Sequence, residues 1–273
     1  MRNSLPPQEP GESPGAVLPW ILRLGVAACF LGHGMLGVVQ TAAWTSYFAV
    51  MGIGRDTALH LMPVVGAIDV AMAALVMIRP TRRLAFFMVV WCAWTALLRP
   101  LAGESFWEGI ERAGNYGAPL GLLLLMRKDG VKSWVGNSFR DVLDASQSQL
   151  LGWVLRLTTV LLLLGHGALG LIVRKPVFSA QYSVLSLPGA SIEPYIGGFE
   201  CVLALTVLLK PDRRLLFGVV AWKLATEALA PMAGSPVWVF IEHGGSYAAP
   251  LALAFLHAKI RPPAMSVTAI PAT

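Results

Sequence analysis

The sequence predicts an all-α integral membrane protein with eight transmembrane helices, arranged as two parallel four-helix repeats. Three observations lead to this prediction. Of the 273 residues, 56% are hydrophobic and only 13% are charged, whereas roughly one-quarter of the residues of a soluble domain are charged. The apolar residues form stretches of about 20, the length that a helix needs to cross a bilayer core of about 30 Å. The third observation is an internal duplication.

The apolar stretches follow one another along the chain, and Gly and Pro residues interrupt the fourth and the eighth. They cover residues 18–38, 59–79, 84–101, 107–126, 150–173, 189–209, 214–232 and 238–258. The proline-rich segment 1–17 is predicted to be a flexible tail rather than a cleaved signal peptide, because the first span has a near copy deep in the chain. Residues 127–149 form a predicted cytoplasmic linker, and residues 259–273 form a C-terminal tail.

The duplication is visible without gaps in two long alignments. Trp20–Gly37 and Trp153–Gly170 share ten of 18 residues, and Val65–Leu120 and Ile196–Leu251 share 23 of 56. The shared residues include arginine, glutamate, tyrosine and proline, which hydrophobicity alone does not match. The chain is therefore expected to be two copies of one structural unit.

The two modules, 18–126 and 150–258, each have an even number of predicted spans, so both enter the membrane in the same direction. Thirteen Lys and Arg residues fall in the termini and the loops after spans 2, 4 and 6, against five on the opposite face. Both termini should therefore be cytoplasmic, in the cell (inner) membrane. The basic residues of the cytoplasmic termini and loops then explain the net charge of +6, and no nucleic-acid partner is expected.

Between the first and second span of each module lies a shorter stretch of mixed polarity, 41–53 and 175–187. We expect each to form a short helix or loop at the outer interface. Trp44, Tyr47 and Tyr182 would anchor it there, because Trp and Tyr are enriched at the level of the headgroups.

Ionisable side chains inside a membrane are costly unless they are paired or hydrated, so each is a candidate functional group. The predicted depths of these groups converge on the outer half of the bilayer. The candidates are His33, Asp69, Arg99, Glu111, Tyr116, His166, Glu200, Lys223, Glu227, Glu242 and Tyr247. Their convergence predicts a small polar cavity in each module that opens outward. The alternative is that Asp69 pairs with Arg99, and Glu111 with Arg112 or a tyrosine, only to lock the helices together.

The two modules differ at aligned positions. Where the first module has Cys92 and Ala96, the second has Lys223 and Glu227, which are spaced i, i+4 on one helix face. Where the first module has Arg99, the second has Ala230. One module is therefore expected to work while the other supports it.

Each first span contains the sequence GHG, at 32–34 and 165–167. A histidine between two small residues can relay protons, hydrogen-bond a quinone head or ligate haem. Haem is not expected, because glycine beside histidine is also ordinary membrane packing. A metal site is not expected either, because the ligands are not clustered. The three cysteines, Cys29, Cys92 and Cys201, lie inside apolar runs and are interpreted as core residues.

The pattern R-L-x-L-G-x-x-F-L-x-x-G, followed by G-x-x-E/D and a basic turn, falls on residues 23–34, 66–69 and 82–83, and on residues 156–167, 197–200 and 213–214. With this pattern, each module resembles the DoxX-like family of small four-helix membrane proteins. The chain departs from the family in carrying two modules and in having Met35, Leu36 and Gly37 where a basic residue often follows. The resemblance implies membership of a group in which some members are linked to quinone-coupled sulfur oxidation or to membrane redox complexes.

The function predicted from these features is that of a membrane subunit of a quinone-linked redox system, which passes electrons from a partner protein on the outer face to quinone. His33 or His166, with Asp69 or Glu200, would hydrogen-bond the quinone head or move its protons. A small-solute or proton-coupled transporter and a non-catalytic membrane scaffold are the alternatives. Besides the lipid bilayer, the outer-face redox protein is the partner that this hypothesis requires.

Overall fold

The computed structural model describes residues 14–127, 139–140, 143–186 and 189–260, and the named elements within these ranges are all helical. In the first half they are α1 (Pro14–Val38), η1 (Ala42–Trp44), α2 (Thr45–Val50), α3 (Arg55–Ile78), α4 (Arg82–Leu101), α5 (Phe106–Glu111) and α6 (Ala113–Leu125). In the second they are α7 (Ala145–Ala168), η3 (Leu169–Val173), α8 (Pro176–Ser183), α9 (Gly189–Leu209), α10 (Arg213–Met232), α11 (Val237–Glu242) and α12 (Gly244–Ile260). Within the described residues, seven helical segments are long and apolar enough to cross a membrane.

The fourth predicted span is divided. α5 ends at Glu111 and α6 begins at Ala113. With 13 residues, α6 is about 20 Å long at a rise of about 1.5 Å per residue, which is less than the hydrocarbon core of a bilayer. Glu108, Glu111 and Arg112 also make this segment more polar than the other spans. The segment is not among the seven, so eight crossings stay a prediction.

Three helices extend a few residues beyond the predicted spans. α1 begins at Pro14, inside the predicted tail, and α12 continues to Ile260. α7 begins at Ala145, inside the predicted linker, because Asp144 and Gln147 form a capping box that starts the helix early. The rest of the predicted tails and most of the linker lie outside the described residues.

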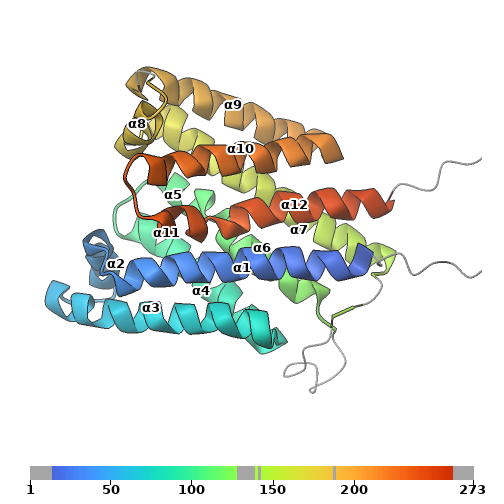
Figure 1. Cartoon of the computed structure of the whole chain (residues 1–273), viewed down its shortest axis with the longest axis horizontal. Helices are drawn as coiled ribbons and strands as arrows, with labels where there is room; N and C mark the ends of the chain where they lie inside the picture. Colours follow the sequence, from blue (N-terminus) through green and yellow to red (C-terminus); the bar gives the residue numbers. More distant parts are fainter. Residues whose placement is uncertain (1–13, 128–138, 141–142, 187–188, 261–273) are drawn as a thin grey trace, which may run out of the picture.

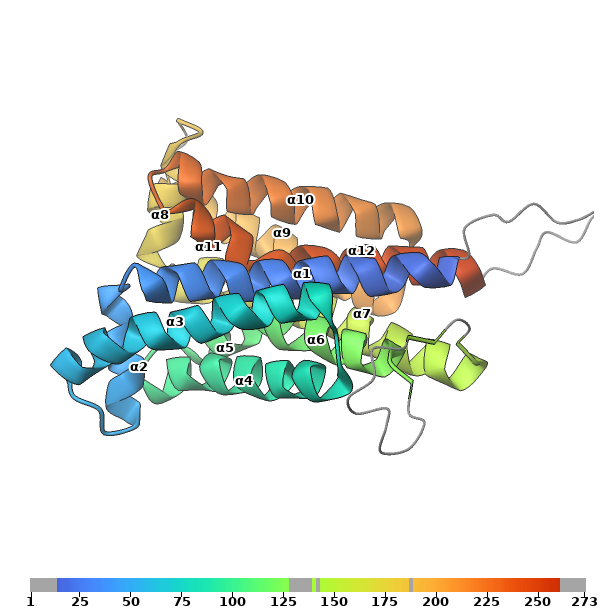
Figure 2. The same ribbon diagram turned by 60° about the horizontal axis from the view of Figure 1, so that its bottom comes forward.

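The helices form one elongated bundle. α1, α6, α7 and α12 lie in its middle, with α3 and α4 on one side and α9 and α10 on the other (Figures 1 and 2). The start of α1 and the end of α12 lie at one end of the bundle, and α2 and α8 lie at the other (Figure 1). The short helices α2 and α8 therefore lie at the end opposite the described termini, whereas the turns that join α3 to α4 and α9 to α10 lie at the same end as the termini (Figure 1).

The outer helices turn apolar side chains away from the protein. Ile68 and Leu75 on α3 and Val202 and Leu205 on α9 are each about half exposed. Contiguous exposed apolar surface of this kind is unusual for a soluble monomer, and it suits contact with lipid chains.

The first glycine of each GHG sequence lets one half approach the other closely. A Cβ added at Gly32 would lie 2.3 Å from the backbone nitrogen of Glu242, and one added at Gly165 would lie 2.2 Å from that of Glu111. α1 therefore packs against the break between α11 and α12, and α7 packs against the break between α5 and α6. The second glycine of each sequence packs instead against α3 or α9 of its own half.

An arginine within α1 and an arginine within α7 each bind the end of a neighbouring helix. Arg23 Nε donates to the carbonyl of Val76 at 3.2 Å, and Arg156 Nε donates to that of Val207 at 3.1 Å. These carbonyls belong to the last turns of α3 and α9, where backbone oxygens lack helical partners and cations are favoured. The two arginines thus have a structural explanation.

Candidate functional site

The first pair of predicted site residues meets between α1 and α3. His33 Nδ1 lies 3.0 Å from Asp69 Oδ2. The Asp69 side chain is buried, and that of His33 is 23% exposed. The ring of Trp44 stacks on the imidazole with centroids 4.5 Å apart. Trp44 thus turns inward over the histidine, and the predicted pairing of Asp69 with Arg99 is wrong.

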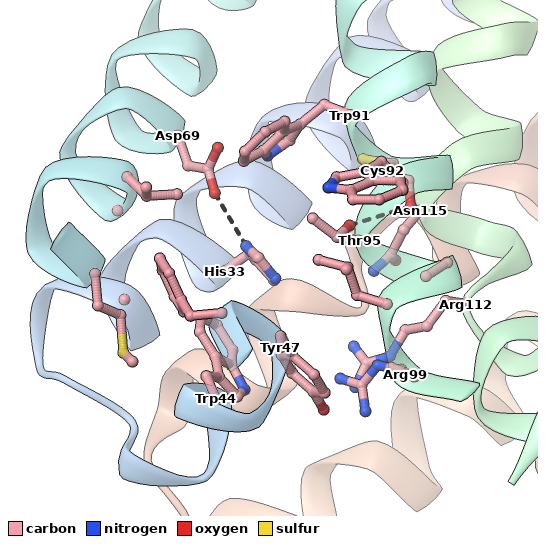
Figure 3. A pocket seen from close by; sticks show the side chains of 18 of the residues that line it. His33, Trp44, Tyr47, Asp69, Trp91, Cys92, Thr95, Arg99, Arg112 and Asn115 are labelled. Atoms are coloured by element: carbon pink, nitrogen blue, oxygen red, sulfur yellow. Dashed lines mark hydrogen bonds and ion pairs between the residues drawn. The ribbon is translucent and has the colours of Figure 1, made fainter. Parts of the chain in front are cut away.

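A cavity of about 130 Å³ opens beside this pair, enclosed by α1, η1, α2, α3, α4 and the start of α6 (Figure 3). Its wall is mainly apolar and aromatic. Three of the predicted site residues line it, His33, Asp69 and Arg99. The other polar and aromatic residues of the wall were not predicted as site residues, and they include Trp44, Tyr47, Trp91, Trp94, Arg112 and Asn115.

One edge of the cavity is an ion-pair chain. Arg99 Nη1 lies 3.1 Å from a carboxylate oxygen of Glu104 and 3.5 Å from one of Glu108. The Tyr47 hydroxyl donates to Glu104, and burial raises the pKa of this phenol above its ordinary value. Lys175 Nζ, from the second half, lies 2.6 Å from Glu108. The chain therefore joins the cavity edge to the other half of the protein.

The second half brings its own histidine and acid together, in a more crowded setting. His166 Nδ1 is within hydrogen-bonding distance of Glu200, and Trp222 Nε1 donates to the other oxygen of Glu200 at 3.0 Å. Lys223 Nζ lies 2.6 Å from Glu227 and 3.7 Å from Glu200. The predicted i, i+4 pair is thus confirmed, and its side chains are buried.

An aromatic ring covers this histidine too. The ring of Phe178 lies 4.5 Å from that of His166, much as Trp44 lies on His33. Tyr182 follows one helical turn later and is 1% exposed. Its predicted role as an anchor facing the headgroups is therefore wrong, because α8 packs its aromatic side chains inward against α9 and α10.

A buried charge network connects the two halves. His243 lies 3.7 Å from Glu227 and 3.3 Å from Glu111. Arg112, which lines the cavity, lies 3.1 Å from Glu111 and 2.9 Å from Glu242. The predicted pairing of Glu111 with Arg112 is thus confirmed. The predicted site did not include His243. The sequence did carry a signal for it, since both copies have a glutamate followed by a basic residue at this position.

The two tyrosines of the predicted site lie away from the cavity wall. The Tyr247 hydroxyl donates to the carbonyl of Phe240 at 3.0 Å. Tyr116 packs against the central hydrophobic core. Both contacts are structural, so of the eleven predicted residues these two do not contribute to the cavity or to the charge network.

Among the described residues, no group of three or more His, Cys, Asp and Glu side chains is placed to hold a metal ion. Cys29 and Cys92 are buried, and Cys201 is partly buried. No model of a protein family, no curated protein and no solved structure matches the chain. The resemblance to the DoxX-like family stays a prediction.

Proposed function

We propose that the cavity of the first half binds the ring of a membrane quinone, and that the protein is the membrane subunit of a quinone-linked redox system. The observation that carries the proposal is the apolar and aromatic cavity with a histidine–aspartate pair at its wall. Largely apolar pockets with a few convergent polar groups are typical small-molecule sites. A cavity of about 150 Å³ accepts a benzene ring, so a volume of about 130 Å³ suits a single ring whose alkyl tail leaves through the opening.

The residues have distinct proposed roles. Nδ1 of His33 faces Asp69, which leaves Nε2 directed toward the cavity (Figure 3). There it would hydrogen-bond a quinone oxygen, with Asp69 fixing the orientation of the imidazole. Reduction of a quinone consumes two electrons and two protons. In this proposal the electrons come from a partner protein at the outer face, and the His33–Asp69 pair passes protons to the ring oxygen.

The proposed setting is a tandem pair of DoxX-like modules with eight spans in the inner membrane and both termini in the cytoplasm. The described ends of α1 and α12 lie together at one end of the bundle, which supports an even number of crossings (Figure 1). The cavity lies toward α2, near the other end. In the proposed orientation it is therefore near the outer face, where the partner protein would dock.

The experiment is equilibrium binding of a short-chain quinone to the full chain in lipid nanodiscs. Ala96 is buried and lines the cavity, so Ala96→Phe would fill it. Ala93 lies on the exposed side of the same helix, so Ala93→Phe is the matched control. We expect saturable binding to the wild type and to Ala93→Phe, and at least a tenfold loss in Ala96→Phe. Absence of saturable binding, or equal binding to both variants, would contradict the proposal.

The buried charge network favours a second candidate, a proton-coupled transporter. Ionisable chains of this kind inside membrane proteins often carry protons. In proteoliposomes, transport through this network would be lost in Glu111→Gln and Glu227→Gln, because each variant removes a carboxylate of the network. Proton-coupled uptake that persists in both variants would remove this candidate.

A further inference from the structure

The two halves differ in how an aligned tryptophan meets an aligned acid. In the second half, Trp222 Nε1 donates to Glu200 Oε1 at 3.0 Å. The aligned residues of the first half are Trp91 and Asp69. Trp91 Nε1 and Asp69 Oδ1 are both buried, and neither has a hydrogen-bond partner among the described residues. Aspartate is one methylene shorter than glutamate, so it leaves open the bond that the second half closes.

The unpaired atoms lie where a ligand could reach them. Both side chains line the main cavity, and both also line a smaller hollow of about 10 Å³ next to it. Asp69 and Trp91 lie side by side at one edge of the cavity (Figure 3). Asn115, which lines the same hollow, has a buried side-chain oxygen that is also unpaired. Buried polar groups are nearly always hydrogen-bonded, so this cluster is suited to an occupant.

The chemistry of the two groups selects that occupant. An indole N–H only donates, and an ionised carboxylate only accepts. One ligand atom can satisfy both only if it accepts from Trp91 and donates to Asp69. A hydroxyl does this, whereas the carbonyl oxygen of a quinone would leave Asp69 Oδ1 unpaired.

We infer that the first half selects the reduced, hydroxyl-bearing form of its ring ligand, with the hydroxyl bridging Trp91 and Asp69, and that the chain binds one such ligand. This inference rests on the proposed function, because it assumes a quinone site. The second half is excluded because Glu200 and Trp222 satisfy each other there. In addition, Lys223 and Glu227 stand in place of the small cavity-lining residues of the first half, and both are buried.

The test compares a short-chain benzoquinone with its hydroquinone, kept reduced under argon, on the full chain in nanodiscs. We expect the hydroquinone to bind about tenfold more tightly than the quinone, at one ligand per chain. Trp91→Phe keeps a ring but loses the donor, so it should weaken hydroquinone binding about tenfold. A quinone oxygen that accepts from the same N–H would be weakened as well, because the preference for the hydroxyl comes from Asp69. Asp69→Glu gives the first half the acid of the second and should lose hydroquinone binding because it closes onto Trp91. Trp222→Phe, the matched control, should leave both affinities unchanged.

The outcomes separate this inference from the proposed function. One outcome is that both forms bind equally, that Ala96→Phe abolishes binding of both, and that Trp91→Phe affects neither. The quinone site then stands and the hydroxyl bridge is wrong, because water fills the gap between Trp91 and Asp69. Two ligands per chain would also overturn the inference. If neither form binds to the wild type, both the inference and the proposed function fall. The Trp91→Phe result decides the matter even if Asp69→Glu does not fold.

Discussion

Glu111 and His243 belong to different halves of the chain and meet in its interior, with Oε1 of the glutamate 3.3 Å from Nε2 of the histidine. Each follows the same repeated pattern, in which a short helix ends on glutamate and a basic residue occupies the break before the next helix. The ionic contact between the halves is thus built at two helix breaks.

Replacing His243 by leucine should destabilise the protein by about 1–3 kcal/mol. The substitution removes one partner from each of two buried carboxylates, Glu111 and Glu227, which keep Arg112 and Lys223. Thermal unfolding in nanodiscs measures the effect. His60, which lies on the exposed first turns of α3, provides the control, and His60→Leu should change stability by less than about 0.5 kcal/mol. Equal stability of the two variants would show that the network contributes nothing.

Gly32→Ala and Gly165→Ala should each destabilise the contact between the halves. The added Cβ would lie within 2.3 Å of backbone that belongs to the opposite half, and overpacking of this kind costs about 1–3 kcal/mol. Gly198 and Gly218 lie in α9 and α10 with nothing within 4 Å of an added Cβ. Alanine there should stabilise by about 0.5–1 kcal/mol, because it restricts the unfolded chain. The order of melting temperatures among the four variants tests the close approach directly.

Lys223 and Glu227 should show strong energetic coupling. Lys223→Met leaves Glu200 and Glu227 without their lysine, and Glu227→Met leaves Lys223 with only the more distant Glu200 at 3.7 Å. Each single substitution should cost about 3–5 kcal/mol, whereas the double substitution keeps the net charge and should cost clearly less than their sum. A double-mutant cycle by thermal unfolding measures this difference, with exposed Lys210→Met as the control. Additive effects would contradict the pairing.

The start of α7 should fray as the pH falls. The backbone N–H of Gln147 donates to the carboxylate of Asp144 and lowers its pKa below the ordinary value. A lowered folded-state pKa means that the capping stabilisation is present above the ordinary pKa of aspartate, about 3.9, and is lost as the pH falls through the lower folded value. Hydrogen exchange at the first amides of α7 between pH 6 and acid follows this loss. In Asp144→Asn, which also caps helices, the protection should change much less with pH.

Much of the fold could be predicted because apolar length and repetition are properties of the sequence alone. The predicted spans at 59–79, 84–101 and 214–232 agree with α3, α4 and α10 within a few residues. The break at Arg112 was harder to place, because it depends on packing. There α7 approaches closely through Gly165, and Arg112 is held by an acid 130 residues away.

The candidate site was predicted in part. The histidine and the acid of each half were predicted to lie at a similar depth in the membrane. In the structure His33 lies beside Asp69 and His166 beside Glu200. The partners of Arg99 could not be predicted, because Glu104 and Glu108 reach it only through the fold of the loop before α5. The aromatic residues of the cavity were missed because tryptophan near a membrane surface has a sufficient explanation in lipid contact.

The arrangement of the four central helices has a consequence for how the protein could be divided. α1 rests on α11 and α12, and α7 rests on α5 and α6, so each half holds a surface made for the other. A fragment produced alone would expose Gly32 or Gly165 and the charges that the other half covers. The two fragments produced together from separate genes should therefore bind each other and rebuild the bundle.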